Sequence, residues 1–194
     1  MIIDAIAMRL VQKLLDENVI TFEKWEIYLY GFQLMIAGVA KFSGFMVLAF
    51  FLDCVVQAIA FLTVFALLRV FAGGHHAKSY LECFITTCLL LFSSILVAQS
   101  DLLGSISYTV AILVVAFTII IKYAPVDSPN RRLNEAEKKL NRKRSIMVVS
   151  IVSLGTFTAY LLKQDLLELC NIVALAVLLE SITLIPIFAF RQIK

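Results

Sequence analysis

One continuous apolar stretch decides the fold: residues 27–72 read IYLYGFQLMIAGVAKFSGFMVLAFFLDCVVQAIAFLTVFALLRVFA. A helix needs roughly 20 apolar residues to cross the hydrocarbon core of a bilayer, so this stretch is too long for one crossing. We divide it near Asp53. The division predicts a first membrane span at about 27–52 and a second at about 54–72.

The rest of the chain has the same character. Apolar residues make up 61% of the 194 residues and charged residues only 16%, with a mean hydropathy of +0.94. A water-soluble domain of this size cannot hide so much apolar surface. Further spans are expected at about 83–98, 102–124, 146–162 and 166–190. We therefore predict an all-α integral membrane protein with about six transmembrane helices, in which residues 1–194 form one membrane-embedded domain.

The N-terminal residues 1–18 have a different pattern, because charged and apolar residues alternate at helical spacing. The apolar positions are Ile3, Ile6, Leu10 and Leu14. This spacing predicts an amphipathic helix, and no continuous apolar core of a signal peptide is present. Two interpretations stay open: an interfacial helix lying at the membrane surface, and a helix docked on the transmembrane bundle.

Basic residues in the connections predict the orientation of the spans, because cytoplasmic loops of membrane proteins carry an excess of lysine and arginine. Of the 17 lysines and arginines, only Lys41 and Lys163 fall on the side opposite to the N-terminus. We therefore expect a multi-pass protein of the cytoplasmic membrane. Both termini and the loop after the second span are predicted to lie in the cytoplasm.

The loop after the second span carries the most distinctive chemistry. It reads Arg69-Val-Phe-Ala-Gly-Gly-His-His-Ala-Lys-Ser-Tyr-Leu-Glu-Cys83 and contains the two histidines of the chain. A cysteine with a histidine is the smallest nucleophile-and-base unit, in which the imidazole takes the thiol proton and the thiolate attacks a carbonyl. His76 and Cys83 are the candidate pair.

The spacing of this pair requires a break in the helix. On one continuous helix, His76 and Cys83 would be two turns and roughly 10 Å apart along the axis, beyond hydrogen-bond reach. Gly73 and Gly74 stand where a departure from helix would begin, because glycine permits backbone angles that other residues avoid. Such non-helical backbone at membrane depth has to face protein or water.

Other interpretations of these residues remain open at this point. Arg69 could simply extend to the lipid headgroups from the end of its span. A metal site could use the four side chains of His75, His76, Cys83 and Cys88. The last of these lies within an apolar span, however, and the spacing matches no standard zinc module. We therefore expect neither a metal nor another cofactor.

Two charged residues fall well inside predicted spans, away from the span ends: Lys41 in the first and Glu180 in the sixth. Intramembrane charges are costly unless they are paired, so they are candidate functional residues. A Lys41–Glu180 pair is conceivable but has no further support in the sequence. These residues also give the alternative function, a non-enzymatic membrane transporter or scaffold for a peptide, in which they line a path and His76 acts as a gate.

Three ordered motifs resemble the accessory gene regulator B (AgrB) family. They are the stretch from Arg69 to Cys83, the stretch Tyr123-Ala-Pro-Val-Asp-Ser-Pro-Asn-Arg131, and the stretch Glu180-Ser-Ile-Thr-Leu-Ile-Pro186. Length and hydropathy also agree, so the resemblance covers essentially the whole chain.

The resemblance implies a membrane-embedded cysteine endopeptidase domain that processes a quorum-sensing peptide precursor of the AgrD type. It implies that His76 and Cys83 are catalytic and that Arg69 and Gly74 are needed for activity. The catalytic positions show no departure from the family pattern. His75 fills a variable position, so no role is carried over to it.

A basic stretch between Lys122 and Arg144 suggests how the precursor is held. The simplest explanation of these basic residues is that they set the topology and contact anionic lipids. The precursors of this family carry an acidic C-terminal tail, and we expect that tail to bind Lys138, Lys139, Arg142 and Lys143. The expected partners are therefore the AgrD-like precursor peptide, the lipid bilayer and, as an open alternative, a second copy in a homodimer, with no nucleic acid.

Overall fold

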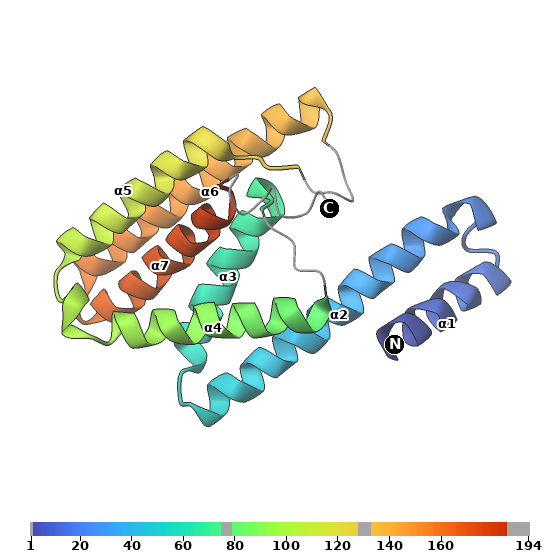
Figure 1. Cartoon of the computed structure of the whole chain (residues 1–194), viewed down its shortest axis with the longest axis horizontal. Coiled ribbons are helices and arrows are strands. Elements are labelled where there is room, and N and C mark those ends of the chain that lie inside the picture. The colour runs from blue at the N-terminus through green and yellow to red at the C-terminus, as the bar shows by residue number, and fades with distance from the viewer. Residues whose placement is uncertain (1, 75–78, 128–132, 186–194) are drawn as a thin grey trace. The chain divides into compact units, whose positions relative to one another are not determined.

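The structure is a computed structural model that describes residues 2–74, 79–127 and 133–185, and these ranges fold into helices with no β-strand among them (Figure 1). Within these ranges, helices α2 to α7 are long and apolar enough to cross a membrane. The predicted fold class, an all-α multi-pass membrane protein, is therefore confirmed. The α-helices are α1 (Ile2–Asp16), α2 (Trp25–Phe51), α3 (Val55–Ala72), α4 (Tyr80–Ala98), α5 (Ile106–Tyr123), α6 (Glu135–Leu162) and α7 (Leu167–Thr183).

Helix α6 begins earlier than its apolar residues predict. The span was expected from residue 146, but the helix starts at Glu135. The cause is a capping box: Asn134 Oδ1 accepts a hydrogen bond from Glu137 N at 2.8 Å, and Glu137 Oε2 accepts one from Asn134 N at 3.0 Å. This reciprocal pair satisfies backbone donors that a helix start otherwise leaves open.

The early start places part of the basic stretch on a helix, although the sequence predicted a connection between two spans there. The residues expected to bind the precursor lie on the first turns of helix α6, in the order Lys138, Lys139, Arg142 and Lys143. A helix fixes the directions of these side chains, whereas a loop would leave them adjustable. Helix α7 ends at Thr183, and residues 186–190 of the last predicted span lie outside the described residues.

The described residues fall into two compact units, residues 1–53 and residues 54–194. In the first unit α1 packs on α2. Ala7 and Val11 are fully buried there, and Gln33 Nε2 donates to Asp4 Oδ1 at 3.0 Å. The predicted N-terminal helix is confirmed and docks on α2. Ile6 and Leu10 remain exposed, and their location at a membrane interface stays a prediction.

In the second unit α7 is the central helix, because it contacts α3, α4, α5 and α6 (Figure 1). In the apolar segment of the α7 span, 44% of the residues are buried inside the protein, against 17–28% in the other spans. Its buried polar groups are paired: Asn171 Nδ2 donates to Leu103 O at 3.0 Å, and the Thr109 hydroxyl donates to Asn171 Oδ1. Small side chains such as Ala174 and Ala176 allow the close packing that membrane helices use.

Candidate functional site

The chain leaves the helical conformation at both described edges of the predicted loop. Helix α3 ends at Ala72, and Gly73 and Gly74 follow with φ angles of +77° and +118°. On the other edge, Ser79 is extended and caps α4 by accepting a hydrogen bond from Glu82 N at 3.1 Å. The predicted break in the helix is therefore confirmed. His75 and His76 lie outside the described residues.

Gly73 brings a distant segment to the end of α3. It forms an isolated parallel bridge with Val126, whose backbone N–H donates to the carbonyl of Ala72 at 2.9 Å. A Cβ atom at Gly73 would collide with the Val126 carbonyl oxygen, so only glycine permits this approach. The segment after α5 is thereby held against the end of α3.

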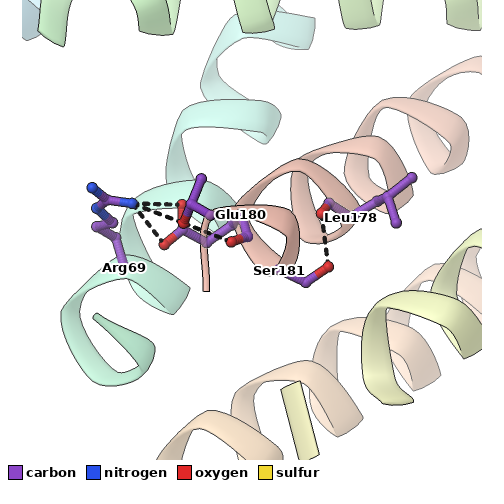
Figure 2. Close-up of polar contacts among 5 residues, drawn as sticks. Arg69, Leu178, Glu180 and Ser181 are labelled. Atoms are coloured by element: carbon purple, nitrogen blue, oxygen red, sulfur yellow. Dashed lines mark hydrogen bonds and ion pairs between the residues drawn. The ribbon is translucent and has the colours of Figure 1, made fainter. Parts of the chain in front are cut away.

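A buried ion pair joins the end of α3 to the end of α7 (Figure 2). Arg69 Nη1 lies 3.3 Å from both carboxylate oxygens of Glu180 and donates to Thr183 Oγ1 at 3.0 Å. The Glu180 side chain is only 1% exposed and that of Arg69 is 25% exposed. Glu180 therefore pairs with the cation of Arg69, whereas a Lys41–Glu180 pair was conceivable from the sequence but had no further support there.

Gly74 is packed against this ion pair. A Cβ atom built on Gly74 would lie 2.5 Å from Thr183 Oγ1, 2.8 Å from Arg69 Nη1 and 3.4 Å from Glu180 Oε1. The positive φ of Gly74 is a second reason for glycine, because side-chain-bearing residues rarely adopt it. Arg69 and Gly74 are thus packed against each other in the structure, and their spacing in the sequence did not reveal this contact.

The three motifs of the sequence therefore meet at one point of the fold. Arg69 to Gly74 come from the first motif, Val126 from the second, and Glu180 with Thr183 from the third. They lie far apart in the sequence, and the contacts described above bring them together. We call this group of residues the glycine junction: Arg69, Gly73, Gly74, Val126, Glu180 and Thr183.

Cys83 lies in the first turn of α4 and is half-buried. Its backbone N–H donates to Ser79 O at 3.1 Å, and its carbonyl accepts from Thr87 Oγ1 at 2.8 Å, so the helix fixes its backbone. The four cysteines are unbridged thiols. Cys88 is also half-buried on α4, which makes it a natural comparison for Cys83. The Ser79 hydroxyl serves as the N-terminal cap of this helix.

The four α6 residues predicted to bind the precursor divide into two kinds. Lys138 Nζ lies 3.5 Å from Asp127 Oδ2 and 3.4 Å from Glu135 Oε1, and Arg142 Nη2 donates to Ile121 O at 2.9 Å, at the end of α5. These two side chains hold the α5–α6 connection together. Lys139 and Lys143 are exposed and lie one helical turn apart.

The contact of Arg69 with Glu180 and Thr183 was not predicted from the sequence, although one signal for it was present. Arg69 lies three residues before the end of α3, and Glu180 lies three residues before the end of α7. The second and sixth spans of a multi-pass protein cross the membrane in the same direction. Opposite charges at equal depth in two such spans indicate a pair, and Lys41 in the middle of its span does not match that depth.

These features define the class of the protein: a multi-pass helical membrane protein with a thiol in the first turn of one span and a glycine-controlled helix break before it. The sequence model of the family described as accessory gene regulator B matches residues 5–184. The chain therefore belongs to the accessory gene regulator B family. Its role lies in the accessory gene regulator system of quorum sensing.

Individual relatives agree with this membership. The chain is 25% identical to accessory gene regulator protein B of Staphylococcus intermedius, over 98% of this chain and 95% of the relative. It is 25% identical to the protein of the same name from Staphylococcus aureus strain MRSA252, over 84% and 83%. It is 26% identical to an AgrB-like protein of Clostridium perfringens strain 13, over 77% and 73%. No solved structure matches the chain.

Proposed function

We propose that the chain is a membrane-embedded cysteine endopeptidase that removes the C-terminal tail of an AgrD-like autoinducing-peptide precursor. Cys83 is the nucleophile and His76 the general base. The observation that carries this proposal is the helix break between Gly73 and Ser79, because the two residues can meet only if the chain bends between them. One unbroken helix would have kept them roughly 10 Å apart.

The reaction is an acyl transfer in two steps. His76 takes the Cys83 proton, and the thiolate attacks a backbone carbonyl of the precursor. The peptide C–N bond breaks, a thioester forms on Cys83, and the proton passes from His76 to the leaving amine. A thiol or hydroxyl of the same precursor then attacks the thioester, releases Cys83 and closes a thiolactone or lactone ring. Water has to be excluded, because hydrolysis would give a linear peptide.

The site is proposed to face the cytoplasm, as the basic residues of the connections predict. A ribosomally made precursor is present on that side. We propose that residues 1–194 act as one membrane-embedded peptidase domain with both termini in the cytoplasm. This chemistry requires no cofactor, and we include a homodimer as a further proposed partner arrangement.

The acidic tail of the precursor is proposed to bind the first turns of α6. Among the four residues suggested by the sequence, Lys139 and Lys143 suit this role best, because both are exposed and one turn apart. Lys138 and Arg142 have partners within the protein, so their substitution would also disturb the α5–α6 connection. Exposed lysines act over short distances in salt, so their contribution should weaken as the ionic strength rises.

Co-expression with a candidate precursor tests the proposal directly. The cleaved tail and the cyclic product are measured by mass spectrometry in cells that carry the wild-type chain, Cys83→Ala, His76→Ala or the matched control Cys88→Ala. We expect no cleavage with Cys83→Ala or His76→Ala, and wild-type cleavage with Cys88→Ala. Cleavage that survives in Cys83→Ala would refute the proposed mechanism.

A further inference from the structure

The glycine junction contains two polar residues on α7, Glu180 and Thr183, that the proposed chemistry does not use. We infer that they are positioning residues: they hold the Arg69 guanidinium against Gly74 and so fix the backbone from which the segment with His76 leaves. This inference rests on the proposed function, because it assigns the residues that orient the base of that reaction.

The Arg69–Glu180 ion pair is better explained by the fixed position that it gives the guanidinium than by a contribution to the stability of the fold. The Glu180 carboxylate is almost fully buried in a span, and Arg69 Nη1 reaches both of its oxygens at 3.3 Å. Buried ion pairs lose much of their attraction to desolvation, and well-packed apolar residues often stabilise a protein as well or better. What the pair supplies that apolar residues cannot is a fixed location for one guanidinium nitrogen.

Thr183 fixes that nitrogen from a second direction. Its hydroxyl donates to Glu180 O at 2.8 Å, so the hydroxyl proton points back along α7. The oxygen is then left as an acceptor for Arg69 Nη1 at 3.0 Å. Two side chains on one helix, Glu180 and Thr183, therefore orient the same donor nitrogen. Ser181, two residues earlier, uses its hydroxyl within α7 by donating to Leu178 O at 2.7 Å (Figure 2).

Gly74 connects this arrangement to the chemistry. Three atoms lie on the side of Gly74 where a side chain would project: Thr183 Oγ1, Arg69 Nη1 and Glu180 Oε1. They leave the backbone no room to move in that direction. Gly74 precedes His76 by two residues. Loss of an interaction that holds Arg69 Nη1 in place would let the guanidinium move and the Gly74 backbone relax, and this would shift the chain that leads to the base. A shift of about 1 Å in catalytic geometry can cost roughly a hundredfold in rate.

The test uses the full-length protein in lipid nanodiscs with a synthetic AgrD-like precursor, and it measures kcat and KM separately. Thr183→Val keeps the shape of the side chain but removes the acceptor, and Glu180→Gln keeps the size but removes the charge. We expect both to lower kcat by about tenfold to a hundredfold with little change in KM, because an interaction that orients the base is realised in the transition state.

Two further variants separate positioning from general stability. Thr183→Ser restores the hydroxyl and should return kcat to near the wild-type value. Ser181→Ala removes a fully buried hydroxyl from the same turn of α7, one that donates to Leu178 O and not to the junction, and should leave kcat unchanged. The folded fraction of every variant is measured in parallel, and rates are compared per folded protein.

The outcomes distinguish this inference from the proposed function. Wild-type kcat per folded protein in both Thr183→Val and Glu180→Gln would overturn the inference, and so would an equal loss of kcat in Ser181→Ala. Failure of Thr183→Ser to recover kcat would overturn it as well. Cleavage by Cys83→Ala would instead refute the proposed function itself, whatever the α7 variants do.

Discussion

The two ends of the α3–α7 interface are built alike but carry different chemistry. At one end Gln57 Nε2 of α3 donates to Glu168 Oε1 of α7 at 3.3 Å, and at the other end Arg69 meets Glu180. Both pairs join residues that are 111 positions apart, so the two helices run in the same direction in a constant register. One carboxylate on α7 therefore meets one α3 side chain at each end.

The difference lies in charge, burial and what stands beside each pair. Glu168 is half-buried and accepts hydrogen bonds from two neutral amides, those of Gln57 and Gln99, each at 3.3 Å. Glu180 is buried, faces a full positive charge and has a glycine with positive φ packed against it. The first pair ties two helices together. The second also positions the backbone that follows α3, a role that is not needed for joining two helices.

The largest effect on stability should come from removing the cation at the buried end. Arg69→Met leaves the Glu180 carboxylate in the interior without its partner, which should cost about 3–5 kcal/mol of unfolding free energy. The double variant Arg69→Met/Glu180→Met should recover most of this stability, because neither charge remains. Unfolding in mixed micelles, followed by circular dichroism, measures both.

Cleavage should not recover in that double variant, since the guanidinium beside Gly74 is gone. Wild-type cleavage by the double variant would mean that the Arg69–Glu180 pair only joins α3 to α7, as the Gln57–Glu168 pair does.

A smaller effect is expected from Gly74→Ala. The new methyl group would meet Thr183 Oγ1, and the positive φ would be strained, at a cost of about 1–3 kcal/mol, with loss of cleavage. The matched control is Gly155→Ala on α6, where a Cβ meets nothing within 4 Å and alanine favours the helix by up to about 1 kcal/mol. Thermal unfolding in detergent and the cleavage assay compare the two; equal stability of both variants would contradict the packing described for Gly74.

The smallest effect is expected at the neutral end. Glu168→Gln keeps an oxygen acceptor for Gln57 and Gln99 and removes only a charge from a half-buried location. Its cost should stay below about 1 kcal/mol, with cleavage unchanged. The same unfolding and cleavage measurements apply. If Glu168→Gln lowered cleavage as much as Glu180→Gln, the two ends would not differ in the way that their surroundings indicate.

The spans and the helix break could be predicted because they depend on neighbours in the sequence. Apolar runs define helices α2 to α7, and two adjacent glycines mark the end of α3. The start of α6 was missed because apolar content was used to find it, whereas a local capping box decides it. Asn134 and Glu137 are three residues apart, so this signal was also local.

The glycine junction could be predicted only in part, because its contacts join distant segments. Arg69 and Gly74 were identified through a resemblance, and no helical periodicity relates them to Glu180 or to Val126. Their meeting depends on the register of α3 against α7 and on the course of the chain after α5. Side-chain depth within the spans is the one physical signal in the sequence that could have narrowed the choice of partner.

The 111-residue separation of Arg69 and Glu180 also sets an order of events during biosynthesis. At about 5–20 residues per second, the ribosome completes α7 roughly 5–20 s after α3 has been made. Throughout that interval the guanidinium has to be solvated by water or headgroups, which its location near the end of α3 allows. The nascent chain therefore cannot assemble the junction until its last described helix enters the bilayer, and we expect a translation product truncated before α7 to lack the proposed cleavage activity.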